Sequence, residues 1–413
     1  MIDLSAVGHT AGAPSTDDVV LVHDYLLVMR GAERTFEAIS ACYPDAPITT
    51  LLYDSARTEG RFDHRHVRTS FLQPVAADQR RFRSFLPLFP VAVNRLAVAG
   101  ARVVISSSSA FAHGVSPAPD AVHICYCHTP FRYVWHERER AVRSFTAAAR
   151  PAARLMLGAV RRWDLRASER VSQFIANSEI TRDRIADFYG RDAIVIHPPV
   201  DVERFSAEPD PQDYMLAVGE IAAHKNIEIA LAACERAGVK LKVVGGGPDL
   251  PRLRERFRNA EFLGRVDDRR LVELYSGCRA LVVAATEEFG ITMVEAHAAG
   301  RPVIAAARGG ALEIVTGETG VLVSPNSVDE MAEALRATDW EGFDVAVLRA
   351  NAERFSSTRF QTRFVDTVNA TLGLAPQRPG SARKTSHEMV TWPDYPVPDA
   401  EIGFAAAGEG SSR

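Results

Sequence analysis

Runs of consecutive apolar residues recur along this chain, and each run is followed by a short loop and then by a segment with helical spacing. The first run covers residues 19–22, and Ala32, Phe36 and Ile39 follow it at helical spacing. Continuous apolar runs are typical of parallel strands that are buried on both faces. The order of strand, glycine-containing loop and helix predicts the opening unit of a Rossmann-like domain.

The same alternation continues in two series. In the first, we expect strands at 48–53, 103–106, 122–127, 174–178 and 193–197, with helices at 141–172 (interrupted at Pro151) and 179–189. In the second, we expect strands at 214–218, 240–244, 260–263, 281–285, 302–306 and 320–323, with helices at 226–237, 250–258, 267–277, 292–299 and 328–337. Two successive series predict an α/β protein with two Rossmann-like domains.

The length of 413 residues suits two domains. Changes in composition along the chain indicate where these domains begin and end. We expect disorder at 1–17, the first domain at 18–197, and a proline- and acid-rich linker at 198–212. The second domain is expected at 213–355, followed at 356–375 by a helix that packs back on the N-terminal domain. Residues 376–413 are rich in proline, glycine and serine and predict a disordered tail.

Other sequence features limit the cellular compartment in which we expect the protein and the kinds of site that it can contain. The chain has five cysteines without zinc-ligand spacing, and its N-terminus lacks the basic and apolar regions of a signal peptide. No apolar run is long enough to span a bilayer. We therefore expect a cytoplasmic protein with reduced cysteines, no metal site, and at most peripheral contact with the inner face of the membrane.

Positive charge is concentrated in the first half of the chain, although the formal net charge is −4. Residues 61–170 contain 18 arginines, no lysine and seven acidic residues. Such a stretch indicates an anionic partner, or equally a set of solvated helix faces. Arg80, Arg81 and Arg83 alternate with aromatic residues, a mixture that suits a membrane interface. The stretch carries no nucleic-acid-binding signature, so nucleic acid is not an expected partner.

The strongest chemical signal follows the expected strand at 281–285. Glu287 and Glu295 stand eight residues apart, with Phe289, Gly290 and Ile291 between them at the start of a helix. A helix N-terminus offers backbone N–H groups to a phosphate, and carboxylates accept hydrogen bonds from sugar hydroxyls. Taken alone, the two acids are as readily interpreted as surface residues of a helix.

This segment resembles the Glu-x(7)-Glu motif of the family-four retaining glycosyltransferases, which have the GT-B fold, two Rossmann-like domains facing across a cleft. The blocks at 296–305, 309–315 and 319–323 resemble the continuation of that family's second domain. The resemblance implies a nucleotide-sugar donor site in the second domain, and neither a cofactor nor a metal.

The resemblance also implies roles for individual residues. Glu287 and the amides of Phe289, Gly290 and Ile291 would bind the donor sugar and phosphate, and Glu295 the ribose. Lys225 would contact the diphosphate, in a loop that begins at Gly219, and Gly264 and Arg265 would shape the nucleotide pocket. The chain departs from the family at Glu220, where an arginine is common. Lys225, with His224 or Arg265, would then have to supply the positive charge.

In the first domain, the stretch from Gly31 to Arg34 resembles the family's loop that approaches the donor phosphate. His128 lies in a His-Thr-Pro-x-Arg-Tyr-x-Trp string that includes Arg132 and is similar to bacterial mannosyltransferases of O-antigen and of acetan- or xanthan-type exopolysaccharide assembly. In that family the histidine contacts the donor sugar. A lone histidine at a strand end is otherwise more often structural.

The function implied is retaining transfer of α-mannose from GDP-mannose to a polyprenyl-diphosphate-linked oligosaccharide. Arg80, Arg81, Arg83 and Arg132 are the candidates for the membrane or acceptor contact. The alternatives are a UDP-sugar donor and a non-catalytic nucleotide-sugar-binding relative, for which Glu220 is the best support. In the family's front-face route, the leaving diphosphate takes the acceptor proton, and the protein contributes positioning and electrostatic stabilisation.

Overall fold

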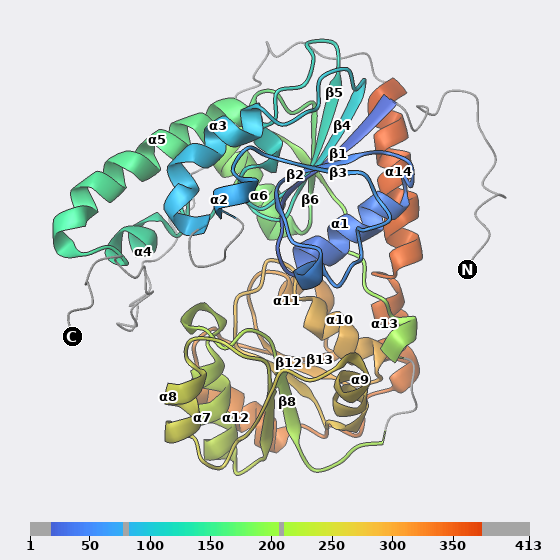
Figure 1. The fold of residues 1–413 in the computed structure, drawn as a ribbon. Helices are drawn as coiled ribbons and strands as arrows, with labels where there is room; N and C mark the ends of the chain where they lie inside the picture. Colours follow the sequence, from blue (N-terminus) through green and yellow to red (C-terminus); the bar gives the residue numbers. More distant parts are fainter. Residues whose placement is uncertain (1–17, 77–81, 206–209, 374–413) are drawn as a thin grey trace.

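The computed structural model describes residues 18–76, 82–205 and 210–373 of the chain. The expected disorder at 1–17 and 376–413 lies outside the described residues, and so do Arg80 and Arg81. The described parts form two lobes, each built around its own parallel sheet (Figure 1). Among the described helices, none is both long and apolar enough to cross a membrane.

The N-terminal lobe is built on a parallel sheet of seven strands in the order β3-β2-β1-β4-β5-β6-β7. The strands are β1 (Val19–Leu26), β2 (Ile48–Tyr53), β3 (Val67–Thr69), β4 (Val103–Ser108), β5 (Val122–Cys127), β6 (Gln173–Ala176) and β7 (Ala193–Val195). The helices are α1 (Gly31–Ala41), α2 (Gln73–Ala76), α3 (Phe89–Asn94), α4 (Arg138–Arg143), α5 (Arg150–Ser168) and α6 (Glu179–Tyr189). Because all strands run parallel, their carboxyl ends meet at one edge of the sheet.

Both faces of this sheet are covered, which explains the continuous apolar runs. Val20 and Val22 of β1 join a core cluster with residues of α3 and α5. Val19 and Leu21, the alternate residues, join a second cluster with residues of α1 and of the last helix. A parallel strand enclosed in this way needs apolar side chains at every position.

The C-terminal lobe has a six-stranded parallel sheet in the order β10-β9-β8-β11-β12-β13. The strands are β8 (Met215–Val218), β9 (Leu241–Val244), β10 (Glu261–Gly264), β11 (Leu281–Val283), β12 (Val303–Ala306) and β13 (Gly320–Val323). The helices are α7 (Ile227–Ala237), α8 (Leu250–Arg256), α9 (Asp268–Gly277), α10 (Ile291–Ala298), α11 (Ala311–Ile314) and α12 (Val328–Ala337). Helices α10 and α11 lie on the side of this lobe that faces α1 (Figure 1).

The chain returns to the N-terminal lobe at its described end. After α13 (Val345–Glu353), helix α14 (Ser357–Gly373) runs along the N-terminal sheet (Figure 1). Phe360, Phe364 and Val368 of α14 are buried in the same cluster as the β1 residues Val19 and Leu21. The last described helix therefore completes the core of the first domain.

Several details differ from the expected elements, including four of the described helices that were not expected (α2, α3, α11 and α13). Strand β3 was not expected, because its three residues are partly or fully exposed and show no apolar run. The helix expected at 141–172 is two helices, α4 and α5, with a short 3-10 turn (Ala147–Ala149) between them. Pro151 lies in the first turn of α5, where proline is favoured, so it marks a helix start rather than an interruption.

Candidate functional site

Two of the residues expected to meet the donor from the C-terminal lobe, Lys225 and Glu287, are in direct contact. Lys225 ends a 3-10 turn (Ala223–Lys225) beyond β8, and Glu287 lies in the loop after β11. The Lys225 Nζ lies 2.8 Å from Oε1 and 2.6 Å from Oε2 of Glu287. Strands β8 and β11 are neighbours, so their carboxyl-end loops hold the pair together. Both side chains are only part-buried, so a ligand can reach them.

Glycine allows the loop that carries Glu287 to pack closely against the next strand's loop. The Gly310 N–H donates to the carbonyl oxygen of Glu287 at 3.0 Å. A Cβ at Gly310 would overlap the carbonyl oxygen of Phe289, and one at Gly309 would overlap that of Glu287. Gly290 has φ +101° and immediately precedes α10. The loop from Glu287 to Gly290 is thereby held at the N-terminus of α10.

The other glycines of the expected nucleotide pocket form a second close-packed set. A Cβ at Gly245 would overlap the carbonyl oxygen of Gly219, and Gly245 itself has φ +134°. The Gly245 N–H donates to Gly264 at 2.7 Å, and the Arg265 side chain lies beside Gly246. The loops after β8, β9 and β10 are thus joined backbone to backbone.

Glu295 lies further along α10 and has a protein partner. The Tyr275 hydroxyl donates to Glu295 Oε2 at 2.7 Å. Burial raises the pKa of the Glu295 carboxyl above its usual value, while this hydrogen bond and the charge of Arg34 oppose the change. Arg34 belongs to α1, so the N-terminal lobe places a cation near the residue expected to bind the ribose.

His128 follows β5 and is buried in a hydrogen-bonded group. Its Nε2 lies 2.9 Å from the Ser107 hydroxyl, which also lies 3.1 Å from Nδ1 of His23. Burial, and then the neighbouring His23, lower the pKa of His128 to about 3. His128 is therefore neutral at pH 7 and can act as a hydrogen-bonding group but not as a cation.

The two lobes meet where these segments end. A Cβ at Gly31 would lie 3.1 Å from Cδ1 of Ile291, so the start of α1 contacts the start of α10. Beside this contact, Glu288 lies 3.2 Å from Nη1 of Arg184 and 3.7 Å from Nη2 of Arg132. Burial would raise the pKa of Glu288, but Arg132, Arg184 and Lys225 together hold that pKa below its usual value.

Three of these interface residues were not expected from the sequence. Glu288 and Arg184 form the contact just described, and Glu313 caps α6 from the other lobe. Both carboxylate oxygens of Glu313 lie 3.0 Å from the Glu179 N–H at the start of α6, and Oε2 lies 2.8 Å from His197 Nε2. For Glu288, the only signal in the sequence is its position next to Glu287. Arg184 and Glu313 have no such signal, because a contact between two domains produces no recognisable spacing in the sequence.

Of the arginines expected at a membrane or acceptor, Arg83 and Arg132 lie within the described residues. Arg132 lies at the domain interface, with Glu288 and Glu137 around it, rather than on the outer surface. Arg83 lies in the 3-10 helix Phe82–Leu88. Among the described residues, no cluster of three or more His, Cys, Asp or Glu could hold a metal ion.

Comparison with known proteins agrees with this two-lobed arrangement. The family model described as Glycosyltransferase Family 4 matches residues 29–204, and that of Glycosyl transferases group 1 matches residues 201–338. The chain is 29% identical over 234 residues to D-inositol 3-phosphate glycosyltransferase of Mycolicibacterium smegmatis, a match of 49% of this chain and 52% of that protein. It is also 29% identical over 133 residues to O-antigen chain mannosyltransferase C of Escherichia coli, covering 30% and 36% respectively. The chain thus spans about half the length, or less, of these two relatives.

Among solved structures, Anabaena Alr3699/HepE in complex with UDP superposes with a TM-score of 0.64 at 18% identity. That match covers 86% of this chain and 100% of the other. At 18% identity, the similarity between the two structures shows a shared fold and nothing further. The fold class expected from the sequence is confirmed: the chain has the GT-B fold, and the two glycosyltransferase family models match successive parts of the chain that correspond to its two lobes.

Proposed function

We propose that this chain is a retaining glycosyltransferase that moves a hexose from a nucleotide sugar to an acceptor bound at the domain interface. The observation that carries the proposal is the Lys225–Glu287 pair, placed beside the N-terminus of α10. A cation and a helix N-terminus stabilise a leaving diphosphate, and a carboxylate accepts hydrogen bonds from sugar hydroxyls. The site therefore combines the groups that such a donor needs.

The Lys225–Glu287 pair also suggests how the two side chains exchange partners when the donor binds. Without a ligand, Lys225 and Glu287 neutralise each other at 2.6 Å. A donor diphosphate would attract Lys225 and leave the Glu287 carboxylate to accept from the sugar. His128, kept neutral by burial, would offer a hydrogen bond from the N-terminal lobe. The leaving oxygen would take the acceptor proton, so no protein base is required in this route.

For the donor, we propose GDP-mannose and α-mannosyl transfer. The support is the His-Thr-Pro-x-Arg-Tyr-x-Trp string around His128 and the similarity to an O-antigen chain mannosyltransferase. A UDP-sugar is the second candidate, favoured by the complex of Alr3699/HepE with UDP. A non-catalytic nucleotide-sugar-binding protein is the third, and Glu220 beside the donor loop favours it.

A donor screen tests the proposal. Purified protein is incubated with GDP-mannose, UDP-glucose, UDP-galactose or UDP-glucuronate, with and without a lipid-linked acceptor fraction, and release of the nucleoside diphosphate is measured. We expect release from GDP-mannose above all, and more with the acceptor present. Release from a UDP-sugar alone would assign the second candidate, and binding without release would assign the non-catalytic one.

For the acceptor, we propose a polyprenyl-diphosphate-linked oligosaccharide at the inner face of the cytoplasmic membrane. The support is the arginine-rich first half of the chain and the exposed leucines of α5, of which Leu155 is 72% exposed. Cations on anionic headgroups with apolar side chains at the acyl boundary suit a peripheral contact.

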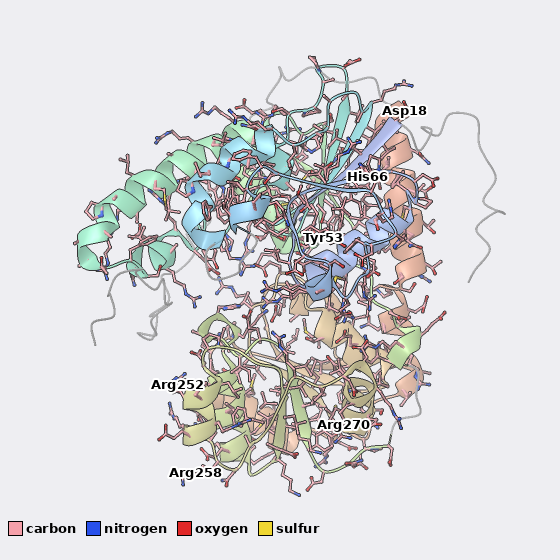
Figure 2. The ribbon with its side chains drawn as sticks, in the orientation of Figure 1. Asp18, Tyr53, His66, Arg252, Arg258 and Arg270 are labelled. Carbon is pink, nitrogen blue, oxygen red and sulfur yellow. The ribbon has the colours of Figure 1, made fainter. Side chains whose placement is uncertain are left out.

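Vesicle sedimentation tests this membrane contact. Replacing Arg80, Arg81 and Arg83 with alanine should weaken binding to anionic vesicles, measured by sedimentation, by up to about a hundredfold, because each basic residue near the surface contributes about 1 kcal/mol. The matched control replaces Arg252, Arg256 and Arg258, three surface arginines of the other lobe, of which Arg252 and Arg258 are labelled in Figure 2. Equal sedimentation of both triple variants would contradict a contact through residues 80–83.

A further inference from the structure

The proposed donor site contains an anion where a cation is expected. Glu220 follows Gly219 directly, in the loop that leads to Lys225. A carboxylate beside a diphosphate is repulsive, and Lys225 is already paired with Glu287. His224 does not offset this repulsion, because burial, and then Lys225 and Arg132, lower its pKa to about 4. Glu220 therefore opposes the positive charge that Lys225 offers to a diphosphate at this loop.

The opposite lobe presents a cation to this position. Nη1 of Arg30 lies 3.3 Å from Oε2 of Glu220. Arg30 is the N-cap residue of α1, and its backbone N–H donates to Glu33 Oε2 at 3.0 Å, which fixes the start of the helix. The next residue, Gly31, contacts Ile291 at the start of α10. The backbone that carries Arg30 is thus held against the helix N-terminus of the proposed phosphate site.

This ion pair is easy to exchange. The side chains of Arg30 and Glu220 are 56% and 36% exposed, and exposed ion pairs contribute little to stability. An arginine binds phosphate oxygens through two parallel N–H groups, a stronger contact than a single exposed carboxylate contact. A diphosphate that enters between the lobes can therefore displace Glu220 from Arg30 without loss of a structural contact.

We propose that Arg30 is a donor-diphosphate contact supplied by the N-terminal lobe, and that Glu220 competes with the diphosphate for it. Donor binding exchanges one anion for another on the same guanidinium. The inference rests on the proposed function and names a residue of the same site.

The proposal predicts that replacing Arg30 and replacing Glu220 have opposite effects on the affinity for a nucleoside diphosphate. Arg30→Ala removes a phosphate contact and should weaken binding of a nucleoside diphosphate by about tenfold. Glu220→Gln removes the competing anion and should tighten it by about two- to threefold. A purely structural pair would respond alike to loss of either partner. The double variant Arg30→Ala with Glu220→Arg returns a cation from the other side and should recover most of the affinity.

Titration calorimetry with GDP, UDP and the two free nucleosides measures these effects on the full chain. The matched control is Arg252→Ala, because the Arg252–Glu228 pair has nearly the same exposure, 52% and 36%, and lies on the outer side of the C-terminal lobe (Figure 2). We expect the Arg30→Ala loss with the diphosphate only, and no change in the control.

Changes of the same sign in Arg30→Ala and Glu220→Gln, or equal affinity of Arg30→Ala and wild type for the diphosphate, would overturn the role of Arg30 and leave the proposed function standing. If wild type binds neither GDP nor UDP, the proposed function itself fails, and the inference fails with it.

Discussion

Single residues in this molecule are fixed mainly by partners that are distant in sequence. Each of three consecutive serines of β4 lies within hydrogen-bond distance of a buried histidine: Ser106 with His123 (2.8 Å), Ser107 with His128 (2.9 Å) and His23 (3.1 Å), and Ser108 with His113 (3.1 Å). The serine run is visible in the sequence, but its partners come from other strands and loops. For that reason, the sequence singled out His128 by resemblance and could not show its environment.

The buried histidines predict a loss of stability in acid. Burial, the largest cause, lowers the pKa of the fully buried His123 from its ordinary value of 6.5 to about 3. The unfolded chain binds this proton more readily, so stability falls as the pH drops from 6.5 toward 3. At pH 4.5 the loss is about 2 kcal/mol for this group.

Urea unfolding at pH 7 and pH 4.5 checks this prediction. His123→Gln should show a smaller drop in the free energy of unfolding between the two pH values than wild type does. His66→Gln, at an exposed position labelled in Figure 2, serves as control and should retain the full drop. An equal drop in all three proteins would contradict the account.

At the scale of elements, hydrophobic spacing predicted the sheets better than the helix boundaries. The strand expected at 122–127 and the helices expected at 179–189 and 328–337 have the observed limits. Apolar runs and caps mark such elements directly. The break between α4 and α5 was misplaced, because a proline is compatible with a helix start as well as with a break. Strand β3 carries no apolar run and left no signal.

Helix α14 should stabilise the N-terminal lobe although it follows the C-terminal one. Phe364 is fully buried, and its ring lies 6.4 Å from that of Tyr126 on β5. Phe364→Ala should cost about 3–5 kcal/mol, the usual cost of truncating a buried aromatic side chain. Chemical denaturation measures the change, with the exposed Arg359→Ala on the same helix as control. Equal stability of the two variants would show that α14 adds nothing to this core.

At the scale of the whole molecule, the candidate site depends on contacts that join the lobes. The fold class could be predicted from the two series of apolar runs, and the contact between Lys225 and Glu287 joins two residues that the sequence had already singled out. Glu288, Arg184 and Glu313 could not be predicted, because their partners belong to the other lobe and no sequence spacing records such a contact. The departure at Glu220 was visible in the sequence, but its partner Arg30 was not.

Glu313 offers a test of whether contacts between the lobes maintain the candidate site. Its carboxylate accepts from the N–H at the start of α6 and lies 2.8 Å from His197. Glu313→Ala should lower the free energy of unfolding by about 1–2 kcal/mol, as expected for a lost helix cap, and should raise the KM for the donor. Glu318→Ala, at an exposed position close by, is the matched control. A variant as stable as this control, with unchanged KM, would contradict the joining role.

Glu287→Ala is the sharpest test of the proposal that the loop after β11 forms the donor site of a glycosyltransferase. Donor-dependent release of nucleoside diphosphate should fall about a hundredfold or more, as for loss of a group that stabilises the transition state. Binding of the nucleoside diphosphate itself should persist, because Lys225 loses its competing partner. Turnover equal to that of wild type in this one measurement would contradict the account.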